Sequence, residues 1–142
     1  MADIIFNKFM RDVGSGLVDW GADTLRIAMY SDISNFTADS TVYSDTNELA
    51  SANGYTQNTK AVASGNIILN DTDNVAQYDV ADITWTAAGG AIGPASGALI
   101  YDVTNGSGAV YLIDFAAAKT ADSGTDFRIT IDASGLFLMR QA

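Results

Sequence analysis

Apolar residues follow two different periods along the chain. Near the N-terminus one set recurs every four residues: Ile5, Phe9, Val13 and Leu17. This spacing predicts one apolar face of a short amphipathic helix. Asp3 stands where it could cap the start of the helix, and Gly14 and Gly16 weaken its end. We expect residues 1–20 to form a helical segment or arm that packs either on the domain's own sheet or on a neighbouring subunit.

From Asp23 onward the apolar period shortens to two, which is typical of half-buried strands. Short strands are predicted at residues 25–29, 66–69, 77–86, 98–103, 109–115, 127–131 and 136–139. In the third of these, alternation puts Ala81, Ile83 and Trp85 on one face and Val80 on the other. The Asn105–Gly106 pair is the strongest hairpin signal in the chain.

These elements predict a mainly β fold, either a β-sandwich or a Greek-key barrel of short antiparallel strands with a short N-terminal amphipathic helix. The chain has 142 residues, so we expect one domain over residues 1–142. Between the first two strands, residues 31–60 are polar and rich in turn residues, including the Asn53–Gly54 pair. A loop of this length is usually functional or stabilised by a partner.

The composition excludes several classes of catalytic site and of binding partner. The chain has seven Lys and Arg against seventeen Asp and Glu, a net charge of −10, and no His or Cys. A Ser-His-Asp triad, a thiol nucleophile and a thiolate metal site are therefore excluded. No Lys or Arg lies between Lys60 and Lys119, which argues against a nucleic-acid partner. No apolar run is long enough for a transmembrane helix, so we expect no membrane partner. We expect no enzymatic activity and no cofactor.

Several short motifs could have either a catalytic or ligand-binding role or a purely structural one. Asp122–Thr125 (DSGT) matches the loop of aspartic proteases, but it occurs once, and a hairpin turn is the simpler interpretation. Asn70–Asn74 offers four oxygen side chains, so Asp71 and Asp73 could hold Ca²⁺, although the EF-hand spacing fails. Asp114 interrupts an apolar strand and favours a structural hydrogen bond or an edge position. Trp20 and Trp85 are predicted to be core anchors, because no cation accompanies them.

Longer stretches resemble one family, the small virion structural proteins of tailed bacteriophages. The resemblance spans nearly the whole chain and is carried by residues 7–30, 48–60 (ELASANGYTQNTK), 80–94 (VADITWTAAGGAIGP), 98–102 (ALIYD), 111–115 (YLIDF) and 127–136 (FRITIDASGL). These are turn and strand patterns rather than catalytic motifs. After Gly93–Pro94 the chain has Ala95-Ser96-Gly97, where many members carry an aromatic or basic pair.

The resemblance implies an all-β module of a phage particle, assembled in the bacterial host cytoplasm and located in the virion. The leading hypothesis is a capsid decoration or cement protein that binds the major capsid protein or other virion subunits, with a homo-oligomer such as a trimer expected. The predicted docking patch is apolar and N-terminal: Ile4, Ile5, Phe6, Phe9 and Met10. One alternative is a tail component (tube, baseplate or fibre) that uses residues 31–60. Another is a receptor- or glycan-binding module that uses Tyr43, Tyr55 and Tyr78.

Overall fold

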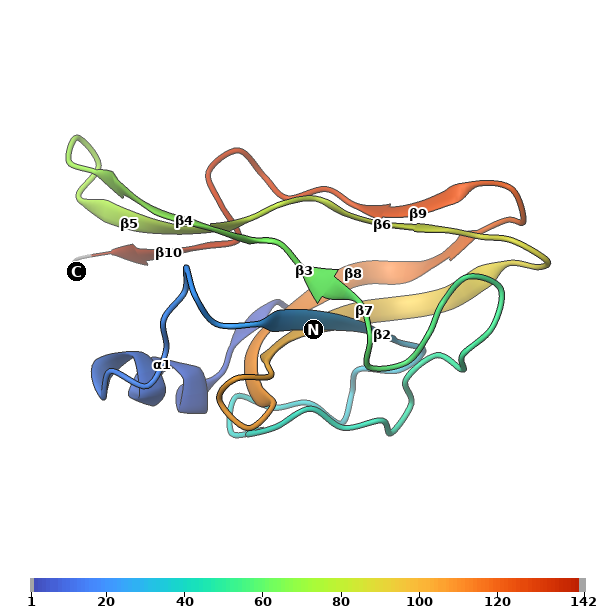
Figure 1. Cartoon of the computed structure of the whole chain (residues 1–142), viewed down its shortest axis with the longest axis horizontal. Coiled ribbons are helices and arrows are strands. Elements are labelled where there is room, and N and C mark those ends of the chain that lie inside the picture. The colour runs from blue at the N-terminus through green and yellow to red at the C-terminus, as the bar shows by residue number, and fades with distance from the viewer. Residues whose placement is uncertain (1, 141–142) are drawn as a thin grey trace.

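The chain, seen here as a computed structural model, is described over residues 2–140 (Figure 1). Strands hold 45% of the residues and helix 6%, so the fold is mainly β with one short helix near the N-terminus, as predicted. In chain order the elements are β1 (Ile4–Ile5), α1 (Asn7–Gly14), β2 (Leu25–Tyr30), β3 (Ala61–Val62), β4 (Ser64–Asn70), β5 (Val75–Val80), β6 (Ile83–Thr86), β7 (Ile92–Asp102), β8 (Gly108–Ala121), β9 (Asp126–Ile129) and β10 (Phe137–Arg140).

The strands form two layers that face each other. One layer is a five-stranded sheet in the order β1-β8-β7-β2-β3. The other consists of the three-stranded sheet β10-β5-β4 and the two-stranded sheet β6-β9, which lie end to end along the top of Figure 1. The strand pairs of all three sheets are antiparallel. The arrangement is sandwich-like, with the main core between the layers.

The five-stranded sheet is buried on both faces. Its inner face packs on the main core, and its outer face carries a second cluster that includes Phe6, Tyr30, Phe36 and Tyr101. As a result every residue from Ala98 to Asp102 is buried, although neighbouring residues of a strand point to opposite faces. The segment 31–60 supplies Phe36 to this outer cluster, so the long loop packs on the chain's own sheet.

The strand predicted at residues 77–86 is two strands in different sheets. β5 ends at Val80 and β6 begins at Ile83, and both residues are 3% exposed. The predicted alternation, with Ala81 on the same face as Ile83 and Val80 on the opposite face, is therefore wrong, because Val80 and Ile83 are buried and Ala81 is exposed. The phase of the alternation shifts at Ala81–Asp82, where the chain passes from one sheet to the next.

The predicted β7–β8 hairpin is confirmed, with its turn one residue further along than expected. Positive φ angles fall at Gly106 and Ser107, and the Gly108 amide donates to the Asn105 carbonyl at 3.1 Å. Both strands are longer than predicted: β7 begins at Ile92 and β8 continues to Ala121. The shift leaves the Asn105 side chain outside the turn, where it contacts the helix.

The helix α1 starts and stops differently from the prediction. Its N-cap is Phe6, which gives no side-chain cap, so the expected role of Asp3 is wrong. Asp3 instead accepts hydrogen bonds from the Tyr111 hydroxyl at 2.8 Å and the Asp114 amide at 2.7 Å. After the last helical residue the chain turns at Gly16, whose φ is +73°, and the Leu17 amide donates to the Asp12 carbonyl in a Schellman motif.

Candidate interaction surface

The predicted N-terminal docking patch is largely folded into the chain's own domain. Phe6 is 0% and Phe9 2% exposed, while Ile4 and Ile5 pair with Leu112 and Tyr111 of β8. Of the five predicted residues, Met10 is the one with a large exposed fraction, 46%. Phe6 and Phe9 are therefore not available to a partner while the segment is folded in this way.

Ring contacts explain why the segment packs on its own domain. The Phe9 ring meets Trp20, Tyr78 and Phe137 edge to face, with centroids 6.0, 6.3 and 5.5 Å away. Edge-to-face pairs stabilise beyond the area that they bury. Trp20 is itself 3% exposed, and its indole donates to the Asp79 carbonyl at 2.9 Å. The helix is thereby held against the three-stranded sheet.

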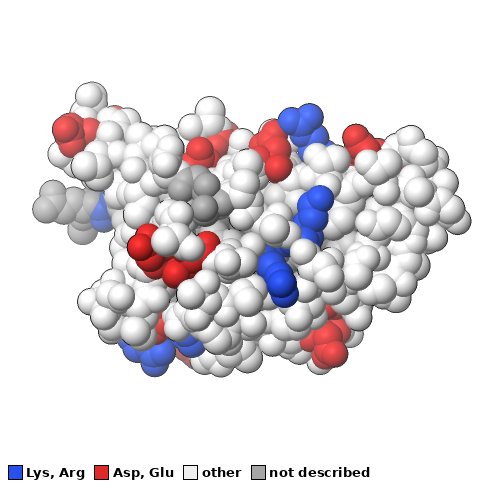
Figure 2. Space-filling view, viewed as in Figure 1, with Lys and Arg blue, Asp and Glu red and all other residues white. Residues whose placement is uncertain are grey.

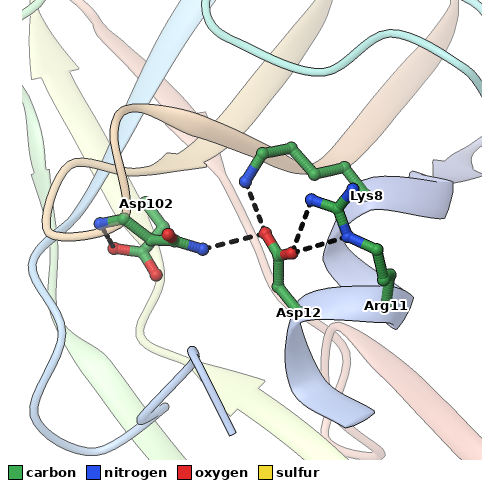
Figure 3. A network of polar contacts seen from close by, with 5 residues as sticks. Lys8, Arg11, Asp12 and Asp102 are labelled. Atoms are coloured by element: carbon green, nitrogen blue, oxygen red, sulfur yellow. Dashed lines mark hydrogen bonds and ion pairs between the residues drawn. The ribbon is translucent and has the colours of Figure 1, made fainter. Parts of the chain in front are cut away.

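A buried polar network fixes the other side of the helix (Figure 3). Asp12 is 1% exposed and accepts from Arg11 Nη2 and Asn105 Nδ2, both at 2.9 Å, and from Lys8. Burial opposes the charged form of Asp12, but the hydrogen bonds from these three side chains outweigh it and keep its pKa below the usual value. The network joins α1 to the β7–β8 turn.

The long loop is organised by Glu48, the one Glu in the chain. Its carboxylate accepts from the hydroxyls of Tyr43 at 2.5 Å and Tyr55 at 2.7 Å, and from the Asn58 amide at 3.4 Å. The Asn58 side chain in turn accepts from the Tyr101 hydroxyl at 2.6 Å, which ties the loop to β7. A carboxylate with this many donors in a buried place acts as a structural centre.

The tyrosines considered for glycan stacking do not form one platform. Tyr55 and Tyr78 are 2% and 6% exposed and belong to the main core. Tyr43 is half-buried and stacks on Tyr101 with centroids 4.6 Å apart. The prediction that Trp20 and Trp85 are core anchors is confirmed, but a cation does accompany Trp85: Lys60 Nζ lies 5.5 Å from its ring centroid.

The short motifs that could have had a catalytic or metal-binding role lie in turns between strands or at the edge of a strand. Asp122–Thr125 connects β8 to β9, and the Thr125 amide and hydroxyl both donate to the Asp122 carbonyl. Asn70–Asn74 connects β4 to β5, where the Asn70 side chain accepts from the Thr72 and Asp73 amides at 3.1 Å. Asp114, on the outer edge of β8, accepts from the Ala116 amide at 2.8 Å. Within residues 2–140, no three acidic side chains gather as a metal-binding group.

One end of the three-stranded sheet leaves apolar side chains in solvent. Leu69 is 73% exposed, and four further residues of β4 and β10 are 37–46% exposed. These five residues are distributed over both faces of the sheet end, and we call them the β4–β10 apolar surface: Ile67, Ile68, Leu69, Leu138 and Met139. The sequence gives a signal for it, because three consecutive apolar residues, Ile67 to Leu69, break the alternation of a half-buried strand. Such an apolar surface is typical of a site of protein contact.

An open groove of about 420 Å³ lies between β8 and β9. Its apolar lining comes from both layers of the sandwich: Ile113, Phe115, Phe127 and Ile129. Lys119, Asp126 and Arg128 add charge to it. The pairing with β1 covers β8 at Tyr111 and Leu112, and in the described part of the chain no strand pairs with this edge beyond them or with the outer edge of β9.

Charged side chains are sparse over the face shown in Figure 2, where most of the surface is uncharged. No helix among the described residues is long and apolar enough to cross a membrane. Comparisons with protein-family models, with curated proteins and with solved structures found no match to this chain. The β4–β10 apolar surface and the β8–β9 groove are the candidate interaction sites among the described residues.

Proposed function

We propose that this protein is a structural component of a tailed-phage virion, without enzymatic activity, that decorates the assembled capsid. The resemblance to small virion structural proteins supports the assignment to virion structural components. The observation that carries the proposal is the β4–β10 apolar surface, which the chain itself leaves uncovered. A surface of this kind gains free energy when the major capsid protein or another virion subunit covers it.

The proposed mechanism is stabilisation by binding. A protein that binds the assembled shell and not its free subunits stabilises the shell by about 2.7 kcal/mol per site at 100 times its dissociation constant. The symmetry of a shell repeats each contact many times, and a trimer at a three-fold axis would add avidity. No bond is made or broken in this role, which fits the structural use of Asp12, Glu48 and the DSGT turn.

Two packing features make the alternatives less favoured. A tail-tube subunit would use residues 31–60 to reach a neighbour, but here Glu48 and Phe36 hold this loop on the chain's own sheet. A glycan-binding module would need accessible tyrosines, and Tyr55 and Tyr78 are buried. The capsid is therefore the location that we propose.

The proposal is tested on particles of a phage that lacks this gene. Purified protein is added, and bound copies are counted by quantitative mass spectrometry while heat resistance is followed by DNA release. Wild-type protein is expected to occupy capsids and to raise the release temperature. Leu69→Asp is expected to lower occupancy at least about tenfold, because burying an unpaired carboxylate costs more than about 1.4 kcal/mol.

Leu17→Asp is the matched control, since Leu17 is 58% exposed and lies outside the β4–β10 apolar surface. It is expected to leave occupancy unchanged. Finding the protein in the tail fraction, or finding no binding to particles, would show that the capsid assignment is wrong. Equal occupancy for wild type and Leu69→Asp would remove the β4–β10 apolar surface from the mechanism.

A further inference from the structure

The end of the β4–β5 hairpin is apolar on both faces of its sheet. Ile68 and Leu138 both align with Gln77 of the central strand, so they share one face. Leu69 and Met139 both align with Ala76, the next residue, so they share the opposite face. A flat partner can cover one of these faces, whereas a groove that receives the end of the sheet can cover both.

The same end carries negative charge at its tip. The β4–β5 turn contains Asp71 and Asp73, and acidic atoms are visible at this end of the molecule in Figure 2. Arg140, at the end of β10, aligns with Val75 and lies across β5 from this edge. The tip is ordered by its own hydrogen bonds, since Asn70 Nδ2 donates to Asp73 Oδ2 at 2.9 Å. An apolar edge strand is therefore followed directly by an acidic turn.

The groove between β8 and β9 has the complementary properties. Phe115 and Phe127, whose centroids are 5.9 Å apart, give it an apolar floor. Lys119 and Arg128 bring two cations to its lining, beside one acidic residue, Asp126, in a chain whose net charge is −10. Arg128 is paired with Asp82 at 2.7 Å, while Lys119 forms no ion pair within residues 2–140. The outer edge of β9, which no described strand pairs with, can also accept an added strand.

We propose that the β4–β5 hairpin of one copy inserts into the β8–β9 groove of a second copy. The apolar side chains of β4 then meet the groove floor, and Asp71 lies against Lys119. In Figure 1 the hairpin turn is at the left end of the molecule and the β8–β9 turn is at the right end, so the contact is head to tail. It repeats from copy to copy and forms a ring or a short row rather than a closed two-fold dimer.

The distribution of charge favours this contact over a two-fold pairing of β4 with β4 of a second copy. Two copies at −10 repel each other unless acidic groups of one meet basic groups of the other. Two-fold antiparallel pairing of β4 with itself places an acidic turn at each end of the contact, and β4 itself contains no cation. Insertion into the groove neutralises Asp71 with Lys119. The inference rests on the proposed structural role, since it names a partner for the same apolar surface.

The test uses purified full-length protein and sedimentation at low ionic strength. Wild type is expected to self-associate with increasing concentration, and less so as salt screens the ion pair. Asp71→Lys and Lys119→Asp should each weaken association about tenfold or more, because each places like charges together. Asp71→Lys also makes the net charge less negative, so general repulsion would predict the opposite change.

Mixing the two variants in equal amounts is the decisive measurement. The lysine introduced by Asp71→Lys in one variant then faces the aspartate introduced by Lys119→Asp in the other. Association is therefore expected to return in the mixture to near the wild-type level. Asp45→Lys, an exposed substitution with the same charge change as Asp71→Lys, is the control and should not weaken association. Circular dichroism melts of each variant verify that it is folded.

Three results would overturn the inference. They are a wild-type protein that stays monomeric at millimolar concentration, a Lys119→Asp variant that associates like wild type, and a mixture without restored association. Self-association without binding to particles would leave the inference standing and contradict the capsid role. Binding to particles by a protein that is monomeric in solution would support the capsid role and contradict the self-association inference.

Discussion

Two aspartates that are equally buried have pKa shifts of opposite direction. Asp12 and Asp102 are each 1% exposed. Asp12 is surrounded by donors from Lys8, Arg11 and Asn105, which outweigh burial and lower its pKa. Burial and a side-chain hydrogen bond with the Asp23 carboxyl, which requires a proton, raise the pKa of Asp102 to about 6. Among the described residues no N–H or hydroxyl group donates to Asp102 Oδ2. Burial raises the free energy of the ionised carboxylate, and the hydrogen-bond donors and cations around it determine whether that increase is offset.

Asp102 makes stability depend on pH. Its pKa is higher in the folded chain than the ordinary 3.8, so the folded state binds more protons between about pH 4 and 6. The free energy of unfolding contributed by this group is therefore full at low pH and falls as pH rises through that window. Asp102→Asn keeps an acceptor for the Asn105 amide and cannot ionise. We expect it to be about 2 kcal/mol more stable than wild type at pH 7, after allowance for screening of the partly exposed Asp23.

Urea unfolding of wild type and Asp102→Asn at pH 4 and pH 7 measures this difference. The gain is expected at pH 7 and should shrink toward zero at pH 4, where the wild-type carboxyl is also protonated. A difference that is equal at both pH values would mean that the charge of Asp102 is not its cause.

At the scale of elements, the Asn53–Gly54 turn locks the long loop to the edge of the second layer. Both residues have positive φ angles, and Ala52 and Tyr55 exchange backbone hydrogen bonds across the turn at 2.9 Å. The Asn53 carbonyl also accepts from the Ala88 amide at 3.0 Å. The turn thus lies tightly against the end of β6.

Gly54 is required there for space as well as for its φ of +98°. A Cβ at this position would lie 2.2 Å from the Thr86 carbonyl oxygen. Gly54→Ala is expected to lower the free energy of unfolding by about 2–4 kcal/mol, since it combines backbone strain with a steric clash. Gly16→Ala shares the positive φ but meets no atom within 4 Å, so it should cost about 1 kcal/mol. Thermal melts of the two variants separate the two causes, and equal losses would argue against the clash.

In the molecule as a whole, the N-terminal segment joins the five-stranded sheet, its outer cluster and the three-stranded sheet. β1 extends the five-stranded sheet, Phe6 enters the outer cluster and Phe9 enters the main core. Asp12 then fixes the β7–β8 turn. The segment is therefore a structural part of the domain, and its removal affects both faces of the central sheet.

Deletion of residues 1–12 is expected to abolish cooperative unfolding or to lower the melting temperature by more than about 15 °C. The physical reason is that truncating one buried Phe to Ala typically costs about 3–5 kcal/mol, and here two are lost from a domain of ordinary stability. Met10→Ala, at a side chain that is 46% exposed, should change the melting temperature by only a few degrees. A deletion variant that melts like wild type would instead support a docking arm.

The local pattern of the chain was enough to determine its class and most of its elements. Alternation located β2, β9 and β10 to within a few residues. The four-residue spacing indicated a helix but not its bounds, since Phe9 and Val13 lie in α1 whereas Ile5 belongs to β1 and Leu17 follows the helix. Gly135, with a φ of +97°, lies between the strands predicted at residues 127–131 and 136–139. These features depend on neighbours in sequence, so the sequence carries them directly.

Contacts between distant residues were decided by the tertiary structure. The periodicity of the N-terminal segment requires that Phe9 be covered, but it does not say by what, and the answer is Trp20, Tyr78 and Phe137. The phase shift at Ala81 arises because the chain changes sheets there. The β8–β9 groove is lined by residues of both layers, and the exposure of Leu69 depends on whether another segment covers the end of β4. A local period encodes neither of these.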